Sequence, residues 1–176
     1  SFLGGKEHYH PRLYPSPADF EDTTPYKQCP YICIAPTSVW FTKQYPAEKW
    51  IDFINAVPQK YRIFLLGGPE DKALCDGIVQ KSLNKNITVL AGKLSILKTA
   101  ALMRDATMNF VNDSGPMHMA SAVNAPVTAI FCSTIPAFGF GPLSEKSYTV
   151  EVPEKLACRP CGLHGKLNCP EKHFNC

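Results

Sequence analysis

The chain has 176 residues, of which 45% are hydrophobic and 19% charged, and its formal net charge at pH 7 is +3. This length suits one ordinary domain, and this composition excludes a disordered chain. The small net charge, without a dense run of lysine and arginine, excludes nucleic acid as the expected partner.

The first 30 residues are rich in proline, tyrosine and charge and show no sustained hydrophobic period. They predict a linker or extended arm over residues 1–30. They also lack the basic and then apolar order of a signal peptide, and no apolar run in the chain reaches the roughly 18 residues that span a bilayer. We therefore expect a cytoplasmic protein.

From residue 31 onward, short apolar runs alternate with stretches of helical period. The runs that predict buried strands are 31–35, 62–66, 87–90, 108–111 and 127–132, with a sixth strand expected at 147–152. The helices expected between them are 47–57, 70–83, 95–106 and 116–123. Parallel strands bury both faces and need crossover connections. This order therefore predicts an α/β fold, a Rossmann-like doubly wound parallel sheet over residues 31–153.

Ligands of such sheets bind at the carboxyl ends of the strands, so the residues that follow each strand are the candidates for a site. The first strand is followed by Thr37 and Ser38, and Lys43 comes shortly after them. Hydroxyls, free backbone N–H groups and a lysine can cradle a phosphate, although the pattern is not that of a Walker loop. A capped helix start with a solvated lysine would explain the same residues.

The second and third strands are followed by weaker signals. Gly67 and Gly68 allow a ligand to approach the backbone, and Glu70 can accept hydrogen bonds from ribose hydroxyls. An acidic residue also stabilises any helix amino terminus, which is the alternative for Glu70. Leu94 follows the third strand, where it can form the wall of a base pocket, and Ser95 can cap the next helix.

The turn after the fourth strand is the most distinctive part of the sequence. Asp113 or Ser114 can cap the helix that follows, and Pro116 suits its first position, where a missing N–H costs nothing. The Asp113 side chain can instead turn outward to a hydroxyl or to a cation such as Lys43. The turn thus carries an ionisable group at a place where a simple cap would suffice.

The same turn predicts an anion site. The N–H groups of Ser114 and Gly115, together with the helix dipole, attract negative charge. His118 lies one turn further, where it can donate a hydrogen bond to a phosphate oxygen. Ionisable groups that converge at such an edge favour a ligand site, and the pyrophosphate of a nucleotide is the natural anion.

The order of these motifs resembles the carboxyl-terminal half of family 9 glycosyltransferases, the lipopolysaccharide heptosyltransferases of Gram-negative bacteria. The resemblance runs from about Pro11 to the end, through PTSVWFTKQYP, GGPED, LS, NDSGPMHMASA and FCSTIPAFGFGP. The DSGPMH motif is its most specific part. The resemblance implies the GT-B fold, in which two Rossmann-like domains face each other across a cleft, and a transfer reaction that requires no metal or other cofactor.

By position, the resemblance implies that this half binds the donor, ADP-L-glycero-D-manno-heptose. It places Ser38, or its neighbour Thr37, and Lys43 at the donor phosphates or sugar. It places Glu70 at the adenosine ribose and Leu94 near the adenine.

For the turn after the fourth strand, the resemblance places Asp113 at the heptose and Ser114, Gly115 and His118 at the pyrophosphate. In the family, an amino-terminal domain supplies the acceptor site for the lipopolysaccharide core and an aspartate base. We expect this chain to lack that domain and base, and therefore not to transfer sugar alone. Peripheral contact with the inner face of the inner membrane is expected of the whole enzyme.

A cysteine-rich tail is expected over residues 154–176. It holds the CxxC pair and two later cysteines, Cys158, Cys161, Cys169 and Cys176, which resemble the tail of heptosyltransferase II-type members. Four thiolates, with His164 and His173 as substitutes, suit zinc, while reduced thiols or a disulfide are the alternatives. We expect a structural role that does not require contact with the site. The other four cysteines are scattered, which is typical of small buried residues.

The leading hypothesis is a donor-binding glycosyltransferase domain. Two alternatives from other classes stay open on the sequence alone. One is a nucleotide-binding module without transferase activity, and the other is an interaction protein with a zinc-binding tail.

Overall fold

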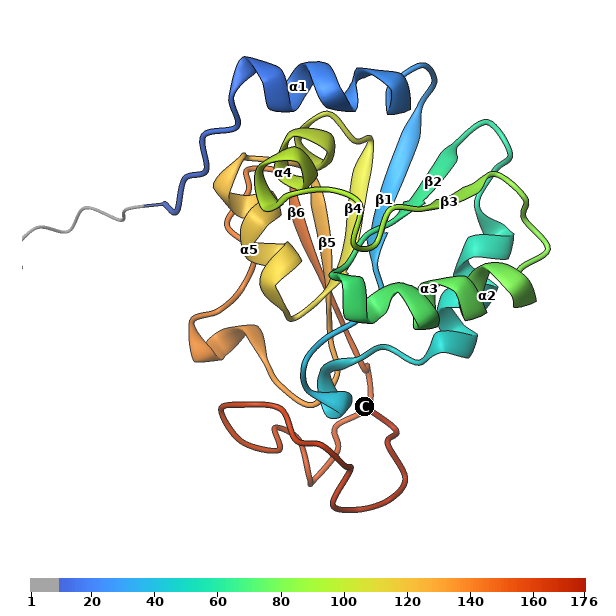
Figure 1. Ribbon diagram of the computed structural model, residues 1–176. Coiled ribbons are helices and arrows are strands. Elements are labelled where there is room, and N and C mark those ends of the chain that lie inside the picture. The colour runs from blue at the N-terminus through green and yellow to red at the C-terminus, as the bar shows by residue number, and fades with distance from the viewer. Residues whose placement is uncertain (1–9) are drawn as a thin grey trace, which may run out of the picture.

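The computed structural model describes residues 10–176 and contains one six-stranded parallel sheet (Figure 1). Its strands are β1 (Tyr31–Ala35), β2 (Arg62–Leu65), β3 (Ile87–Val89), β4 (Met108–Asn112), β5 (Val127–Phe131) and β6 (Ser147–Glu151). Their order is β3-β2-β1-β4-β5-β6, and all five pairings are parallel. The order reverses between β1 and β4, which makes their carboxyl ends the topological switch point. The predicted Rossmann-like fold is confirmed.

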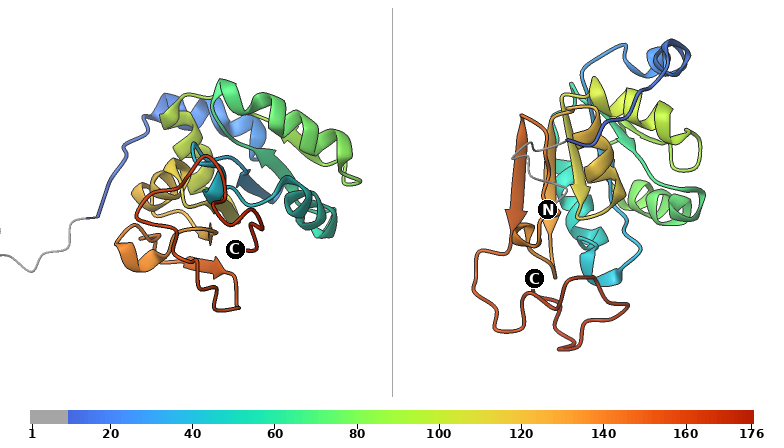
Figure 2. Two further views of the ribbon diagram at one scale, coloured as in Figure 1. Left: turned by 90° about the horizontal axis from the view of Figure 1, so that it is seen from below. Right: turned by 90° about the vertical axis from the view of Figure 1, so that its left-hand side faces the viewer.

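Helices cover both faces of the sheet (Figures 1 and 2). Trp50 and Ile54 of α2 (Ala47–Ala56) and Cys75 and Ile78 of α3 (Lys72–Lys81) form one apolar cluster with the sheet. On the opposite face, α4 (Ile96–Arg104) and α5 (Gly115–Ala122) form a second cluster. Successive residues of β1 alternate between these clusters because a strand points its side chains to opposite faces in turn.

The predicted helices are all present, with changes at their ends. The helix expected from residue 70 begins at Lys72, after the short 3-10 turn η3 (Pro69–Asp71). The N–H of Gly68 donates to Asp71 Oδ2 at 2.7 Å, so the acidic residue closes this turn before the α-helix starts. Ser95 caps α4 as predicted, because its hydroxyl accepts from the N–H of Lys98 at 3.2 Å.

The prediction of an extended arm over residues 1–30 is wrong for its second half. Residues 17–26 form the helix α1 (Pro17–Thr23) and the 3-10 turn η1 (Thr24–Tyr26). Ser16 and Asp19 form a capping box at the start of α1. The Arg104 guanidinium lies 3.7 Å from the centre of the Phe20 ring, which attaches α1 to α4. A helix of seven residues is too short to show a hydrophobic period, and residues 1–9 of the predicted arm lie outside the described residues.

The cysteine-rich tail, residues 154–176, contains neither helix nor strand and lies beyond the carboxyl ends of the strands (Figures 1 and 2). It is joined to the sheet by Arg159, whose guanidinium donates to the carbonyl oxygens of Phe131, Cys132 and Thr134. Among the helices of residues 10–176, none combines the length and the apolar character that crossing a bilayer requires.

Three of the four scattered cysteines, Cys33, Cys75 and Cys132, are buried, whereas Cys29 is exposed. Burial raises the thiol pKa of Cys75 and of Cys132 from 9.0 to about 12. Between these pH values the unfolded chain releases thiol protons that the folded chain retains, so stability falls as the pH rises. We expect each thiol to lower the free energy of unfolding by up to about 1.4 kcal/mol per pH unit.

Urea unfolding between pH 8 and pH 11 measures this decrease in the free energy of unfolding. Cys75→Ala should make the slope of stability against pH shallower, whereas Cys29→Ala, at an exposed position, should leave the slope unchanged. An unaltered slope in the Cys75 variant would contradict the assignment.

Candidate functional site

A buried ion pair lies at the carboxyl edge of the sheet, where β4 ends. Asp113 is 4% exposed, and its Oδ2 atom lies 2.7 Å from Lys43 Nζ. The hydroxyl of Thr134, which follows β5, donates to the same oxygen at 2.6 Å. The sequence named Lys43 as a cation toward which Asp113 could turn, and this contact is confirmed. Desolvating two charges is costly, so the presence of such a pair is weak evidence that it stabilises the fold.

Lys43 ends a 3-10 turn, η2 (Phe41–Lys43), in the loop between β1 and α2. Asn112, the last residue of β4, attaches this loop to the neighbouring strand. Its Nδ2 donates to the carbonyl oxygens of Pro36 and Thr37 at 2.9 and 3.2 Å, and its Oδ1 accepts from the N–H of Tyr45 at 3.0 Å. Sequence reasoning missed Asn112, although an asparagine in an apolar strand is a usable signal because strands disfavour it.

The helix α5 begins at Gly115, with Pro116 in its first turn, and no side chain caps it. Of the two alternatives for Asp113, the structure therefore shows the turn toward Lys43 and not the cap, and Ser114 stands at the cap position without capping by its side chain. The Asp113 carboxylate faces Lys43 and Thr134, and the Ser114 hydroxyl donates to the carbonyl oxygen of Asn112 at 3.3 Å. The amino terminus of α5 thus keeps unpaired N–H groups and its positive dipole end, which together suit an anion.

The remaining predicted residues of this turn are open to solvent. Gly115 and His118 are both exposed, and His118 lies in the first turn of α5. The hydroxyls of Thr37 and Ser38 make no hydrogen bond within residues 10–176, whereas their carbonyl oxygens accept from Asn112 and Gln44. The half-exposed hydroxyls of Thr37 and Ser38 and the exposed His118 imidazole therefore keep their hydrogen-bonding capacity within the described residues.

Glu70 and Leu94 lie at the same edge, after β2 and β3. Glu70 is exposed, and its carboxylate folds back over Gly68, where an added Cβ would lie 2.5 Å from Glu70 Oε1. Leu94 is half-buried against the core. The loop that carries Leu94 packs closely on η3, because a Cβ on Gly92 would meet Pro69 Cα at 2.9 Å. Within the described chain, no hydrogen bond or ion pair joins Glu70 to Asp113 or Lys43.

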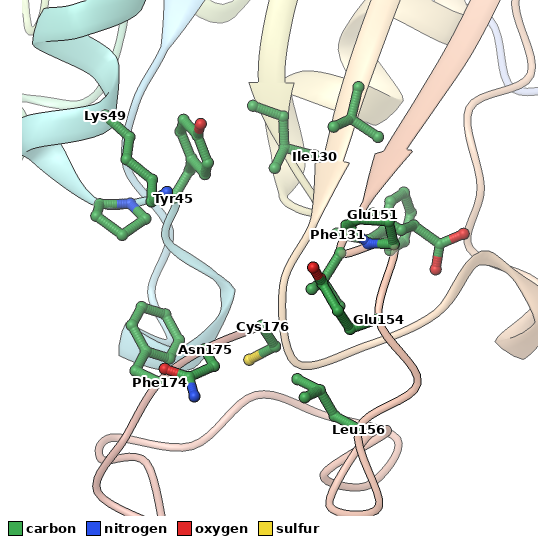
Figure 3. A pocket seen from close by; sticks show the side chains of 14 residues that line it. Tyr45, Lys49, Ile130, Phe131, Glu151, Glu154, Leu156, Phe174, Asn175 and Cys176 are labelled. Atoms are coloured by element: carbon green, nitrogen blue, oxygen red, sulfur yellow. The ribbon is translucent and has the colours of Figure 1, made fainter.

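A hollow of about 620 Å³ lies near this edge, between α2, the ends of β5 and β6, and the tail. Figure 3 shows Tyr45 and Lys49 on one side of it, Ile130 and Glu151 on the other, and Cys176 of the tail below. None of the residues predicted to bind a ligand lines this hollow. The predicted site therefore lies outside this hollow.

The tail cysteines are all free thiols and are partly buried. Burial, and after it the neighbouring Cys158, raises the pKa of the Cys161 thiol. Cys158 Sγ lies 3.7 Å from His173 Nε2. In the stretch from residue 10 to residue 176, however, no three His, Cys, Asp or Glu side chains are gathered so that they could hold a metal ion. The zinc alternative therefore has no ligand set in this arrangement.

The tail nevertheless contacts the site, which the sequence did not lead us to expect. Gly165 lies against Trp40 and Lys43, so that an added Cβ would meet Trp40 Cβ at 2.2 Å and Lys43 Cγ at 3.0 Å. The backbone of Lys166 is hydrogen-bonded to Thr42, the residue before Lys43.

A doubly wound parallel sheet with this strand order is the architecture of the Rossmann-like domains. Within that class, the chain belongs to glycosyltransferase family 9 (heptosyltransferase), whose family model matches residues 8–168.

The chain is also similar to three heptosyltransferases of Escherichia coli. It is 36% identical over 107 residues to lipopolysaccharide heptosyltransferase 3 of Escherichia coli strain K12, which covers 59% of this chain and 31% of that protein. A solved structure of E. coli ADP-heptose lps heptosyltransferase II is 21% identical, with a TM-score of 0.76 over 89% of this chain and 52% of that one. E. coli heptosyltransferase WaaC with ADP is 20% identical, with a TM-score of 0.69 over 86% of this chain and 47% of that one.

At these identities the structural likeness establishes the fold alone. The chain spans about a third of the length of the curated relatives it matches, with 31% of one and 34% of another.

Proposed function

We propose that this chain is the donor-binding domain of a family 9 heptosyltransferase, and that it holds ADP-heptose at the carboxyl edge of its sheet. The observation that carries the proposal is the buried pair of Asp113 and Lys43 directly before the uncapped amino terminus of α5. The name of the similar E. coli structure with ADP supports adenosine diphosphate as the nucleotide.

The diphosphate is assigned to α5 and its surroundings. When the bond between sugar and phosphate breaks, negative charge grows on the departing diphosphate. The N–H groups of Ser114 and Gly115, the His118 imidazole and the Lys43 ammonium stabilise that charge without a metal ion. Because the backbone N–H groups and the paired Lys43 ammonium are held in place before the reaction, they need little reorganisation as the charge develops.

The heptose is assigned to the second oxygen of Asp113. The Lys43 ammonium and the Thr134 hydroxyl both contact Oδ2, while Oδ1 has no hydrogen-bond partner within residues 10–176. A carboxylate oxygen accepts hydrogen bonds, so Oδ1 suits a sugar hydroxyl. The adenosine is assigned to the ends of β2 and β3, with Glu70 at the ribose and Leu94 near the adenine. Thr37 and Ser38 supply hydroxyls beside the phosphates.

The whole enzyme, in this proposal, transfers heptose to the lipopolysaccharide core with inversion, at the inner face of the inner membrane. An inverting transfer needs a base that takes the proton of the acceptor hydroxyl. We assign that base, and the acceptor site, to a second domain. This chain alone is therefore expected to bind the donor but not to transfer sugar.

Isothermal titration of the chain with ADP and with ADP-heptose tests the proposal. We expect the sugar nucleotide to bind about tenfold more tightly, since Oδ1 of Asp113 adds charge-assisted hydrogen bonds to the heptose. Asp113→Asn should reduce that preference. Equal affinity for the two ligands would favour a nucleotide-binding module without transferase activity, and no binding of either would overturn the proposed site.

A further inference from the structure

Thr42 is a buried junction between three segments that lie far apart in the sequence. It is 1% exposed, and its N–H donates to the carbonyl oxygen of Lys166 in the tail at 3.1 Å. Its hydroxyl oxygen accepts from the N–H of Lys166 at 2.8 Å and from the hydroxyl of Ser133 at 3.0 Å. Its carbonyl oxygen accepts from the N–H of Ser133 at 3.2 Å. Tail, β1 loop and β5 loop therefore meet at one threonine.

Two residues of this junction, Thr42 and Ser133, are each followed in the chain by a residue that contacts the Asp113 carboxylate. Thr42 precedes Lys43, whose ammonium pairs with Asp113, and Ser133 precedes Thr134, whose hydroxyl donates to the same carboxylate oxygen. The tail also holds Ser133 directly, because the N–H of Cys161 donates to the Ser133 carbonyl oxygen at 2.9 Å. Movement of the tail would therefore move both partners of Asp113.

Close packing of the tail on the β1 loop adds to this attachment. Gly165 leaves no room for a side chain, since even a Cβ would lie 2.2 Å from Trp40 Cβ. Further along the tail, the Phe174 ring packs on the ring of Phe41 with 5.0 Å between their centres. The tail thus contacts residues before Thr42, namely Trp40 and Phe41, and Lys43 after it.

We propose that the cysteine-rich tail, residues 154–176, is a positioning element for the donor site and that it acts through Thr42 on Lys43. The proposal rests on the proposed function, because it treats Lys43 as a ligand of the donor phosphates. A lysine has a long side chain whose ordering costs free energy. In η2, which is three residues long and has no side-chain cap, local structure alone does little to order it. Attachment to the tail adds to the order that the Asp113 ion pair and the Asn112 hydrogen bonds give Lys43 and its loop before the ligand binds.

Substitution of Thr42 tests the proposal with ADP as the probe. Thr42→Val keeps the shape of the side chain but removes the hydroxyl that joins Lys166 and Ser133. We expect ADP to bind about tenfold more weakly to this variant, measured by isothermal titration at a temperature where circular dichroism shows it folded. Thr42→Ser keeps the hydroxyl and should restore the affinity of the unchanged protein.

A double-variant cycle with Lys43→Met separates positioning from general stability. If Thr42 acts through Lys43, adding Thr42→Val to Lys43→Met should cause no further loss of ADP affinity. If Thr42→Val lowers the unfolding temperature but leaves the ADP affinity unchanged, the inference is overturned while the proposed function stands. If the Lys43→Met variant binds ADP with the same affinity as the unchanged protein, the proposed function is overturned instead.

Gly165 provides an independent test from the tail side. Gly165→Ala should push the tail away from Trp40 and weaken ADP binding in the same way as Thr42→Val. Gly141→Ala is the matched control, because that loop glycine would place its Cβ at an ordinary 3.6 Å from Pro136. Equal ADP affinity in the two glycine variants would contradict the role of the tail.

Discussion

Replacing Lys43 by methionine is expected to lower the free energy of unfolding by about 3 kcal/mol and to weaken ADP binding at least about tenfold. The two side chains of the pair are only 15% and 5% exposed, so Asp113 would be left in a buried place without its cation. Thr134 would remain as a donor to the carboxylate, but a neutral hydroxyl does not balance a charge. Urea unfolding and isothermal titration measure the two effects on the same protein sample.

Two further variants separate the pair's stability from its binding role. Lys43→Met combined with Asp113→Asn removes both charges, so it should recover much of the lost stability while ADP binding stays weak. Lys72→Met breaks a comparable ion pair with Asp76 whose side chains are 56% and 39% exposed. Lys72→Met should lower the free energy of unfolding by less than about 0.5 kcal/mol, because water screens exposed pairs. A double variant that regains ADP affinity along with stability would show that Lys43 does not touch the ligand.

Much of the fold could be predicted because its central strands are buried on both faces. A run such as Tyr31–Ala35 is apolar at every position, which is the pattern of a central parallel strand, and all five of its residues are buried. The helix α1 could not be predicted in this way, because only Thr23 of its seven residues is buried. Its signal was local, in the capping box of Ser16 and Asp19, and the proline-rich surroundings concealed it.

The candidate site could be predicted only where its chemistry follows a strand directly. Asp113 and Lys43 were named because each follows a strand of the sheet, and the structure brings them together. Their use in ligand binding stays a prediction. Asn112 and Thr42 were missed, since their hydrogen bonds join residues 76 and 124 positions apart. Contacts between a side chain and a distant backbone atom leave no period and no motif in the sequence.

Arg159 provides the second large expected effect. Replacing it by methionine should lower the free energy of unfolding by about 3 kcal/mol, because its side chain is 11% exposed and its guanidinium donates to four acceptors. Three of these are the carbonyl oxygens of Phe131, which ends β5, and of Cys132 and Thr134 just after it, at distances of 2.6 to 3.2 Å. The fourth is the Glu151 carboxylate at 2.7 Å. Methionine would fill the space but leave those oxygens without a donor.

Arg159→Lys tests whether geometry or charge accounts for the effect. A lysine keeps the positive charge near Glu151, but its ammonium lacks the planar fork with which arginine reaches several acceptors at once. We expect it to recover less than half of the stability lost in Arg159→Met. Glu151→Gln removes only the ionic partner, whose side chain is 36% exposed, and should cost less than about 1 kcal/mol. If Glu151→Gln costs as much as Arg159→Met, the ion pair and not the three carbonyl oxygens attaches the tail to the sheet.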